Sequence, residues 1–205
     1  MEIRKVGYKE KDVIKKVVDI HIKTFKGFFL TFMGRRFLKL MYSCYTRFSK
    51  AGLIVAIEKD DVLGFLAYSE DMSGLYRYMI KHGFFAFVWF AFLAFLRRPK
   101  TFFRLFAALK KPKDAEREEK YVELASIGVD PDKKRGGVGS ALISALKAMV
   151  DFNEFSYIAL ETDAANNDAA NAFYVKNGFT VAKTFVKNGD RPMNEYRYRN
   201  EDPRS

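Results

Sequence analysis

The chain has 205 residues, of which 49% are hydrophobic and 30% are charged, and this composition supplies enough apolar surface for one packed domain. It excludes intrinsic disorder, collagen and a small disulfide scaffold. Lysine and arginine outnumber aspartate and glutamate by 36 to 25, which gives a net charge of +11 and favours an anionic ligand or surface.

Cysteine and histidine are too scarce for several kinds of chemistry. Cys44 is the only cysteine, so a disulfide within the chain and a site built from several thiolates are both excluded. His21 and His82 are the only imidazoles, which argues against a zinc site and against a His-dependent nucleophile. The N-terminus lacks the pattern of a secretory signal. We therefore expect a cytoplasmic protein without a metal.

The first part of the chain predicts a strand, two helices and a hairpin. Apolar residues recur at helical spacing in two segments and in short runs elsewhere. The expected elements are a strand at 2–7, helices at Lys11–Phe25 and Gly34–Phe48, and strands at Leu53–Ile57 and Val62–Tyr68. Lys59, Asp60 and Asp61 stand between the last two strands and are typical of a tight turn.

A segment rich in phenylalanine, residues 71–119, follows this hairpin. Its uncharged stretch Gly83–Leu96 has 14 residues, which would reach only about 21 Å in a helix, short of the about 30 Å of a bilayer core. Pro99 then starts a second apolar helix that extends to Leu109. We expect a helical insertion built as a hairpin, and not a full membrane span.

Three roles are open for the 71–119 insertion. Aromatic stripes at helical spacing fit a cover for the sheet or for the partner in a homodimer. The flanking cations also fit a helix on an anionic bilayer, with residues 76–111 in peripheral contact with the inner membrane surface. A lid or tunnel for an apolar substrate is the third alternative. Residues 1–50 carry a net charge of +9 and residues 76–120 one of +7, so these two regions hold the basic excess.

Strands and helices alternate after the charged linker Lys113–Lys120. The expected elements are a strand at Tyr121–Val129, a helix at Gly137–Val150, a strand at Tyr157–Thr162, a helix at Asp168–Lys176, and strands at Phe179–Val186 and Met193–Tyr198. The helix from Gly137 has one apolar face, so we expect it to cross over between two parallel strands. Asn188 and Gly189 are expected to close the last hairpin.

The loop Lys133–Ser140 is basic and rich in glycine, and it lies between a strand and a helix. Glycine lets the backbone approach an anion closely, and the first amides of a helix have no partner within it. The helix N-terminus adds partial positive charge, and Lys133, Lys134 and Arg135 add full charges. We predict that this loop binds phosphate.

Other phosphate-binding and nucleic-acid motifs fit less well. A Walker loop requires Gly-Lys-Ser/Thr, but this loop ends in Gly139, Ser140 and Ala141. Leu142 stands where the dinucleotide fingerprint has its third glycine. The aromatic residues lie in apolar runs and are not interleaved with the cations, so we do not expect nucleic-acid binding.

The loop and its flanking motifs resemble the GNAT N-acetyltransferase superfamily. The acetyl-CoA loop of that family reads Gln/Arg-x-x-Gly-x-Gly/Ala, and Lys134–Gly139 fits it with lysine in the first position. Leu124–Pro131 is similar to the family's fourth strand, and Asn167–Phe179 to its second cofactor motif. The resemblance implies a single α/β (α+β) domain over residues 1–205, with a mixed, largely antiparallel sheet of six to seven strands. Helices would cover both faces, and the insertion would lie between the third and fourth strands.

The resemblance also implies acetyl transfer from acetyl-CoA to a small-molecule or lipid-linked amine by direct attack in a ternary complex. The Ile127 amide would polarise the thioester carbonyl, and Tyr174 would protonate the departing thiolate. The residues implied to bind acetyl-CoA are Ile127, Val129, Lys134, Arg135, Gly136, Gly137, Val138, Gly139, Ser140, Asn167 and Tyr174.

Simple acid–base chemistry agrees with these roles. A phenol has a pKa of about 10 and a free thiol one of about 8.5, so Tyr174 is protonated at pH 7 and can give its proton to the sulfur. The amine must lose a proton, and Glu123 matches a frequent general-base position of the family, although a salt bridge at the strand edge is an alternative role for it. A noncatalytic CoA-binding or protein-interaction module is the alternative function of the chain.

Overall fold

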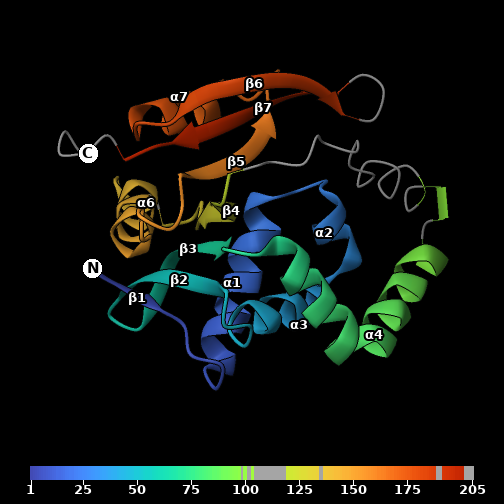
Figure 1. The fold of residues 1–205 in the computed structure, drawn as a ribbon. Coiled ribbons are helices and arrows are strands. Elements are labelled where there is room, and N and C mark those ends of the chain that lie inside the picture. Colours follow the sequence, from blue (N-terminus) through green and yellow to red (C-terminus); the bar gives the residue numbers. More distant parts are fainter. Residues whose placement is uncertain (98, 101–102, 104–118, 134–135, 188–190, 201–205) are drawn as a thin grey trace.

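The computed structural model describes residues 1–97, 99–100, 103, 119–133, 136–187 and 191–200. They form a seven-stranded sheet in the order β1-β2-β3-β4-β5-β7-β6 (Figure 1). Every neighbouring pair is antiparallel except β4 and β5. The strands are β1 Glu2–Lys5, β2 Ala51–Glu58, β3 Asp61–Ser69, β4 Tyr121–Val129, β5 Tyr157–Asp163, β6 Thr180–Lys187 and β7 Arg191–Tyr198. The predicted sheet is confirmed.

Helices cover both faces of this sheet, as expected. They are α1 Lys11–Thr24, α2 Phe29–Met33, α3 Arg35–Tyr45, α4 Met72–Arg97, α6 Val138–Met149 and α7 Asp168–Lys176. The side chains of a strand alternate between its two faces, so Leu53 and Val55 of β2 belong to one core and Ile54 and Ala56 to the other. The first core includes residues of α1, α3 and the start of α4, and the second includes residues of α6 and α7.

The α4 helix lies between β3 and β4, as predicted, but it is longer than the uncharged stretch suggests. It has 26 residues and is long and apolar enough, by length and composition alone, to cross a membrane. The estimate of about 21 Å is therefore wrong as a helix length, because the helix also includes Met72–His82. Figure 1 shows that α4 bends along its course. Most of the predicted second helix, up to Leu109, and the turn at Asn188 and Gly189 lie outside the described residues.

Candidate active site

The parallel strands β4 and β5 are paired over a short distance only. Their register joins Tyr121, Val122 and Glu123 to Tyr157, Ile158 and Ala159 and goes no further, although both strands continue. Beyond this point β4 remains paired with β3, and β5 remains paired with β7. The two strands therefore separate toward their C-terminal ends and open the sheet beside the loop that follows β4.

The backbone of β4 presents polar groups to this opening. The Asp130 amide donates to the Leu63 carbonyl at 2.8 Å. Residues that bond to the neighbouring strand alternate along an antiparallel pair, so Ser126 and Gly128 also bond to β3. The amides of Ile127 and Val129 and the Ile127 carbonyl then face β5, whereas the Val129 carbonyl accepts the Thr24 hydroxyl of α1 at 3.3 Å. An extended ligand chain can pair with these groups as an added strand does.

A bulge sets this orientation. The pairing of β3 with β4 shifts at Ala67 and Tyr68, which pair with Ser126 and Leu124 and leave Ala125 between them. One extra residue in a strand reverses the alternation that follows it and is common beside active sites. Without the bulge, the backbone amide and carbonyl of Ile127 would point toward β3.

Buried side chains of α1 and α3 support β4 at Ser126, the residue before Ile127. His21 Nδ1 and the Tyr42 hydroxyl share a hydrogen bond of 2.7 Å, and Tyr42 also bonds to the Ser126 side chain. Burial lowers the pKa of His21 to about 4 and raises that of Tyr42. The imidazole is therefore neutral at pH 7, and the chain of hydrogen bonds links α1 and α3 to the residue before Ile127.

The predicted phosphate loop leads into the N-terminus of α6. Gly137 is the N-cap, with φ of +88°, and no side chain caps the helix. The first bond of the helix runs from the Ala141 amide to the Gly137 carbonyl, so the amides of Val138, Gly139 and Ser140 precede it. Among the described residues, a Cβ at Gly136 or Gly137 would meet no atom within 4 Å. Open space beside unpaired amides at a helix N-terminus fits a bound phosphate.

The other loop residues have more varied roles than the sequence predicts. Lys134 and Arg135 lie outside the described residues. Lys133 forms an ion pair with Asp61 at 2.9 Å, so its positive charge is partly neutralised. A Cβ at Gly139 would lie 2.9 Å from Phe173 Cζ, so this glycine also allows α6 and α7 to approach closely.

Asp130 fixes the start of the loop. Its carboxylate is almost completely buried, and it accepts the Asp132 amide at 3.1 Å. Lys23 of α1 reaches both Asp130, at 3.1 Å, and Asp132, at 2.8 Å. These contacts hold the C-terminal end of β4 against α1, which positions the loop relative to the opening.

Tyr174 lies in α7 and is buried on its inner side. Its ring packs against those of Phe173, Phe179 and Tyr196, with centroids 5.4, 6.1 and 5.6 Å away. Burial, followed by the nearby Tyr196, raises the pKa of the Tyr174 phenol to about 12. The phenol is thus held in the protonated form that a proton donor requires.

Asn167 joins the end of β5 to the start of α7. Its amide nitrogen donates to the Thr162 hydroxyl at 2.8 Å and to the Asp163 carbonyl at 3.2 Å. It does not cap the helix through its side chain. Asn167 therefore fixes the edge of the opening that faces Ile127 and Val129.

Glu123 lies before the point at which β4 and β5 separate, opposite Ser69 of β3 and Ala159 of β5. It lines a cavity of about 470 Å³. The other charged residues of this cavity are Lys50, Glu70, Asp71, Glu119, Lys120 and Glu154. Carboxylates outnumber lysines here, which favours a cationic group.

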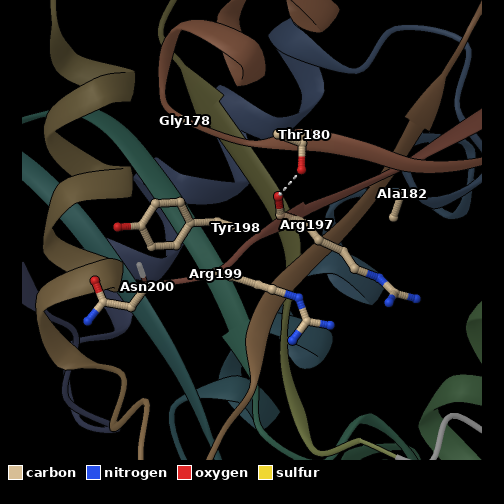
Figure 2. A pocket seen from close by; sticks show the side chains of 7 residues that line it. All are labelled: Gly178, Thr180, Ala182, Arg197, Tyr198, Arg199 and Asn200. Carbon is tan, nitrogen blue, oxygen red and sulfur yellow. Dashed lines mark hydrogen bonds between the residues drawn. The ribbon is translucent and has the colours of Figure 1, made fainter. Parts of the chain in front are cut away.

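A second cavity of about 470 Å³ is lined by the start of β6 and the C-terminal end of β7 (Figure 2). Its lining includes Arg197, Tyr198 and Arg199. Tyr198 pairs with Ile158, close to the N-terminal end of β5, whereas the opening lies toward Asp163. Both arginines already pair with carboxylates, Arg197 with Glu195 and Arg199 with Glu119. This cavity is therefore separate from the candidate site.

Comparison with known proteins agrees with this geometry. Residues 14–179 match the family described as the acetyltransferase (GNAT) family. The chain belongs to the GNAT acetyltransferase family. No curated protein matches it.

Solved structures share the GNAT fold at low sequence identity. A GNAT-family protein from Desulfovibrio desulfuricans is 14% identical, with a TM-score of 0.59, and the match covers 97% of this chain and 98% of that one. A ribosomal-protein-alanine N-acetyltransferase from Brucella melitensis is 12% identical, with a TM-score of 0.59 and coverage of 97% and 99%. The ribosomal-protein-S18-alanine N-acetyltransferase from Escherichia coli is 14% identical, with a TM-score of 0.57 and coverage of 97% and 92%. At these identities the likeness shows the fold alone.

The GNAT opening also contains residues that the sequence analysis did not identify. Arg191 of β7 pairs through its guanidinium with both carboxylate oxygens of Asp163 and lies 5.7 Å from the ring centroid of Phe28. Asn171 donates to the Asp163 carbonyl at 3.2 Å and accepts the Tyr196 hydroxyl at 3.1 Å. The only sequence signal is the spacing of four residues between Asn167 and Asn171, which places both on one face of α7.

Acidic, histidine and cysteine side chains do not gather into a metal site in the part of the chain that the structure describes. Cys44 is buried, and burial raises the pKa of its thiol to about 11. The thiol is therefore protonated at pH 7, and a nucleophilic thiolate is not available from it.

Proposed function

We propose that the protein moves the acetyl group of acetyl-CoA to an amine by direct attack in a ternary complex, without a covalent enzyme intermediate. The observation that carries this proposal is the separation of β4 from β5 beside an uncapped, glycine-lined helix N-terminus. An extended chain that ends in a pyrophosphate fits the two features together, because one supplies strand-like pairing and the other supplies amides for an anion.

We assign the binding roles as the family resemblance implies, and the described loop and strand support them. The amides of residues 136–140, with Lys134 and Arg135, would hold the pyrophosphate of acetyl-CoA. Ile127 and Val129 would pair with its pantetheine arm, and Asn167 would hold the opposite edge. Bound there, acetyl-CoA supplies an activated thioester.

The catalytic roles divide between β4 and α7. The Ile127 amide would donate to the thioester oxygen and stabilise negative charge that develops on it. Tyr174, whose pKa is about 12, would hand its proton to the departing sulfur. Glu123 would take a proton from the amine, directly or through water, because it lines the cavity next to the point of separation.

We propose an amphiphilic acceptor, such as a lipid-linked amino sugar, and action in the cytosol, where Cys44 stays reduced. The carboxylates around Glu123 favour a cationic amino group. The basic regions of the chain disfavour a soluble polyamine, whose repeated positive charges they would repel.

Replacement of Tyr174 by phenylalanine tests the chemistry. We expect Tyr174→Phe to lower kcat by about 100-fold, the usual contribution of a general acid, with little change in CoA affinity. Tyr198→Phe is the matched control, because Tyr198 lines the cavity that is separate from the candidate site, and this variant should leave kcat nearly unchanged. Release of the CoA thiol with pooled amines measures the rate, and calorimetry measures CoA binding.

Two outcomes would contradict the proposal in different ways. CoA binding without turnover on any amine would favour a noncatalytic CoA-binding module. Absence of heat with both acetyl-CoA and CoA would remove the donor site itself. Glu123→Gln should lower kcat with little change in CoA affinity. An unchanged rate would return Glu123 to a structural role.

A further inference from the structure

The α4 helix exposes a continuous apolar ridge. Its exposed large side chains are Tyr76, Ile80, Phe84, Phe85, Val88, Trp89, Phe92 and Leu96. Six of these recur every four residues, so they form one row along the helix. Phe85 is 85% exposed and Trp89 is 55% exposed. Exposed apolar surface of this extent marks an interaction site.

Helices α2, α3 and α4 together carry cations and no carboxylates, and one of these cations, Arg35, pairs with Asp19 of the neighbouring α1. Residues 20–57, which include α2 and α3, contain seven lysines and arginines and no aspartate or glutamate. Residues 72–113, which include α4, contain nine and likewise no acidic residue. Arg77 and Lys81 are exposed beside the start of the ridge, and Arg97 is exposed at its end. The charge of this surface is therefore complementary to an anionic one.

Contacts along α4 decide between lying on a bilayer and crossing it. Leu75 and Met79 are buried in the first hydrophobic core. Farther along, the Phe87 ring packs against Phe37 of α3, with centroids 5.1 Å apart. Near the end of α4, Ala94 is almost completely buried, and Arg97 Nη1 lies 3.6 Å from the position of a Cβ at Gly34, the N-cap of α3. These contacts hold α4 against the domain along its length, so we expect it to lie on a bilayer and not to cross one while the domain stays folded.

We propose that α4 docks the protein on a bilayer that contains anionic lipid. The exposed side chains enter the boundary between headgroups and acyl chains, and the bordering cations contact the headgroups. A second copy of the chain fits this surface less well. A two-fold interface would bring the same cations of both copies together, and like charges would oppose it. Docking is independent of the proposed acetyl transfer.

The fluorescence of Trp89 tests the proposal directly, because the chain has a single tryptophan. The full-length protein is mixed with vesicles of phosphatidylcholine, alone or with phosphatidylglycerol. We expect emission typical of an exposed indole in the free protein. The mixed vesicles should shift it to shorter wavelength and sediment the protein at low salt, and high salt should weaken both effects.

Substitutions separate the two parts of the surface. Arg77→Gln with Lys81→Gln should weaken partitioning to the mixed vesicles by about 30-fold, since each cation near the surface contributes about fivefold. Phe85→Ser with Phe92→Ser should weaken it by at least about 10-fold through lost apolar burial. Val181→Ser with Val186→Ser, two exposed valines of β6, is the matched control and should change nothing.

Several results would overturn the docking proposal. They are failure to bind the mixed vesicles at low salt, equal binding to neutral vesicles, and emission of a buried indole in the free protein. The last result, whether from a dimer or from another segment of this chain, would show that the ridge is already covered. Calorimetry with CoA on the same samples keeps this outcome distinct from failure of the acetyltransferase proposal.

Discussion

The region from β4 to α7 and the helical layer of α2, α3 and α4 differ in how they are built. In the first, short polar contacts fix the backbone: Asn167 joins β5 to α7, and Asp130 joins the loop to α1. In the second, the prominent feature is surface composition, with exposed aromatic residues and cations but no carboxylates. One region depends on the placement of single atoms, and the other on the sum of many weak contacts.

This difference predicts different responses to substitution. A backbone site can be lost through one residue, because a single atom placed wrongly blocks the ligand or removes a donor. A docking surface loses affinity gradually, since each side chain contributes a small part of the total. The following substitutions test that contrast, beginning with the largest expected effect.

Gly137→Val should abolish detectable CoA binding. Gly137 has φ of +88°, and a Cβ there would meet no atom of the described residues within 4 Å. Valine would therefore strain the N-cap and fill the space beside the amides of α6. Calorimetry should show affinity reduced by at least about 100-fold, which corresponds to the loss of a few hydrogen bonds to a charged group. Binding to mixed vesicles should be unaffected.

Gly178→Val provides the matched control for strain. Gly178 also has positive φ, +78°, but it lies in the turn between α7 and β6. This variant should lower the free energy of unfolding by about 1–2 kcal/mol, as Gly137→Val does, but it should keep its CoA affinity. If both variants lost CoA binding equally, the effect of Gly137→Val would reflect general destabilisation.

Acid should destabilise the packing of α1 against α3 through His21. Its pKa is about 4 in the folded protein and about 6.5 when exposed, so between these values the unfolded chain binds the additional proton. The stability is therefore complete above about pH 6.5 and falls by about 1.4 kcal/mol for each pH unit down to about pH 4. Urea unfolding across this range measures the slope.

The variant His21→Gln isolates this contribution. Glutamine does not titrate and can still bond to Tyr42, so the slope between pH 6.5 and 4 should be flatter than in the wild type. His82→Gln, in the exposed part of α4, serves as the control. Identical slopes for His21→Gln and the wild type would show that His21 is not the source.

Gly139→Ala should lower CoA affinity much less than Gly137→Val does. The added Cβ would lie 2.9 Å from Phe173 Cζ, so α6 and α7 must move slightly apart. We expect a loss of about 1–3 kcal/mol in the free energy of unfolding and a modest fall in CoA affinity. Phe173→Leu in the same chain should restore both, and failure of this rescue would place the defect in the loop.

The sequence predicts the region from β4 to α7 closely. Helix α7 has the predicted bounds, and α6 is one residue shorter at each end than Gly137–Val150. Glycine and N-cap residues mark these ends locally, so the nearby sequence is sufficient. The same local pattern predicts the loop and Tyr174, whose roles as binding and catalytic residues stay predictions.

The sequence does not predict features that join distant segments. Lys133 pairs with Asp61, and Arg191 pairs with Asp163, across separations that no local pattern encodes. The sequence pattern also underestimates the length of α4. Arg77 and Lys81 interrupt the apolar run in sequence, but they lie on the exposed side of the helix, so they do not end it.

The short pairing of β4 with β5 also bears on turnover. Each strand is anchored along its outer edge, β4 by β3 and β5 by β7, so the gap between them persists whether or not it is filled. Entry of acetyl-CoA and release of CoA then require no hinge or strand rearrangement in this part of the sheet. We expect any slow conformational step in the reaction cycle to arise outside these strands.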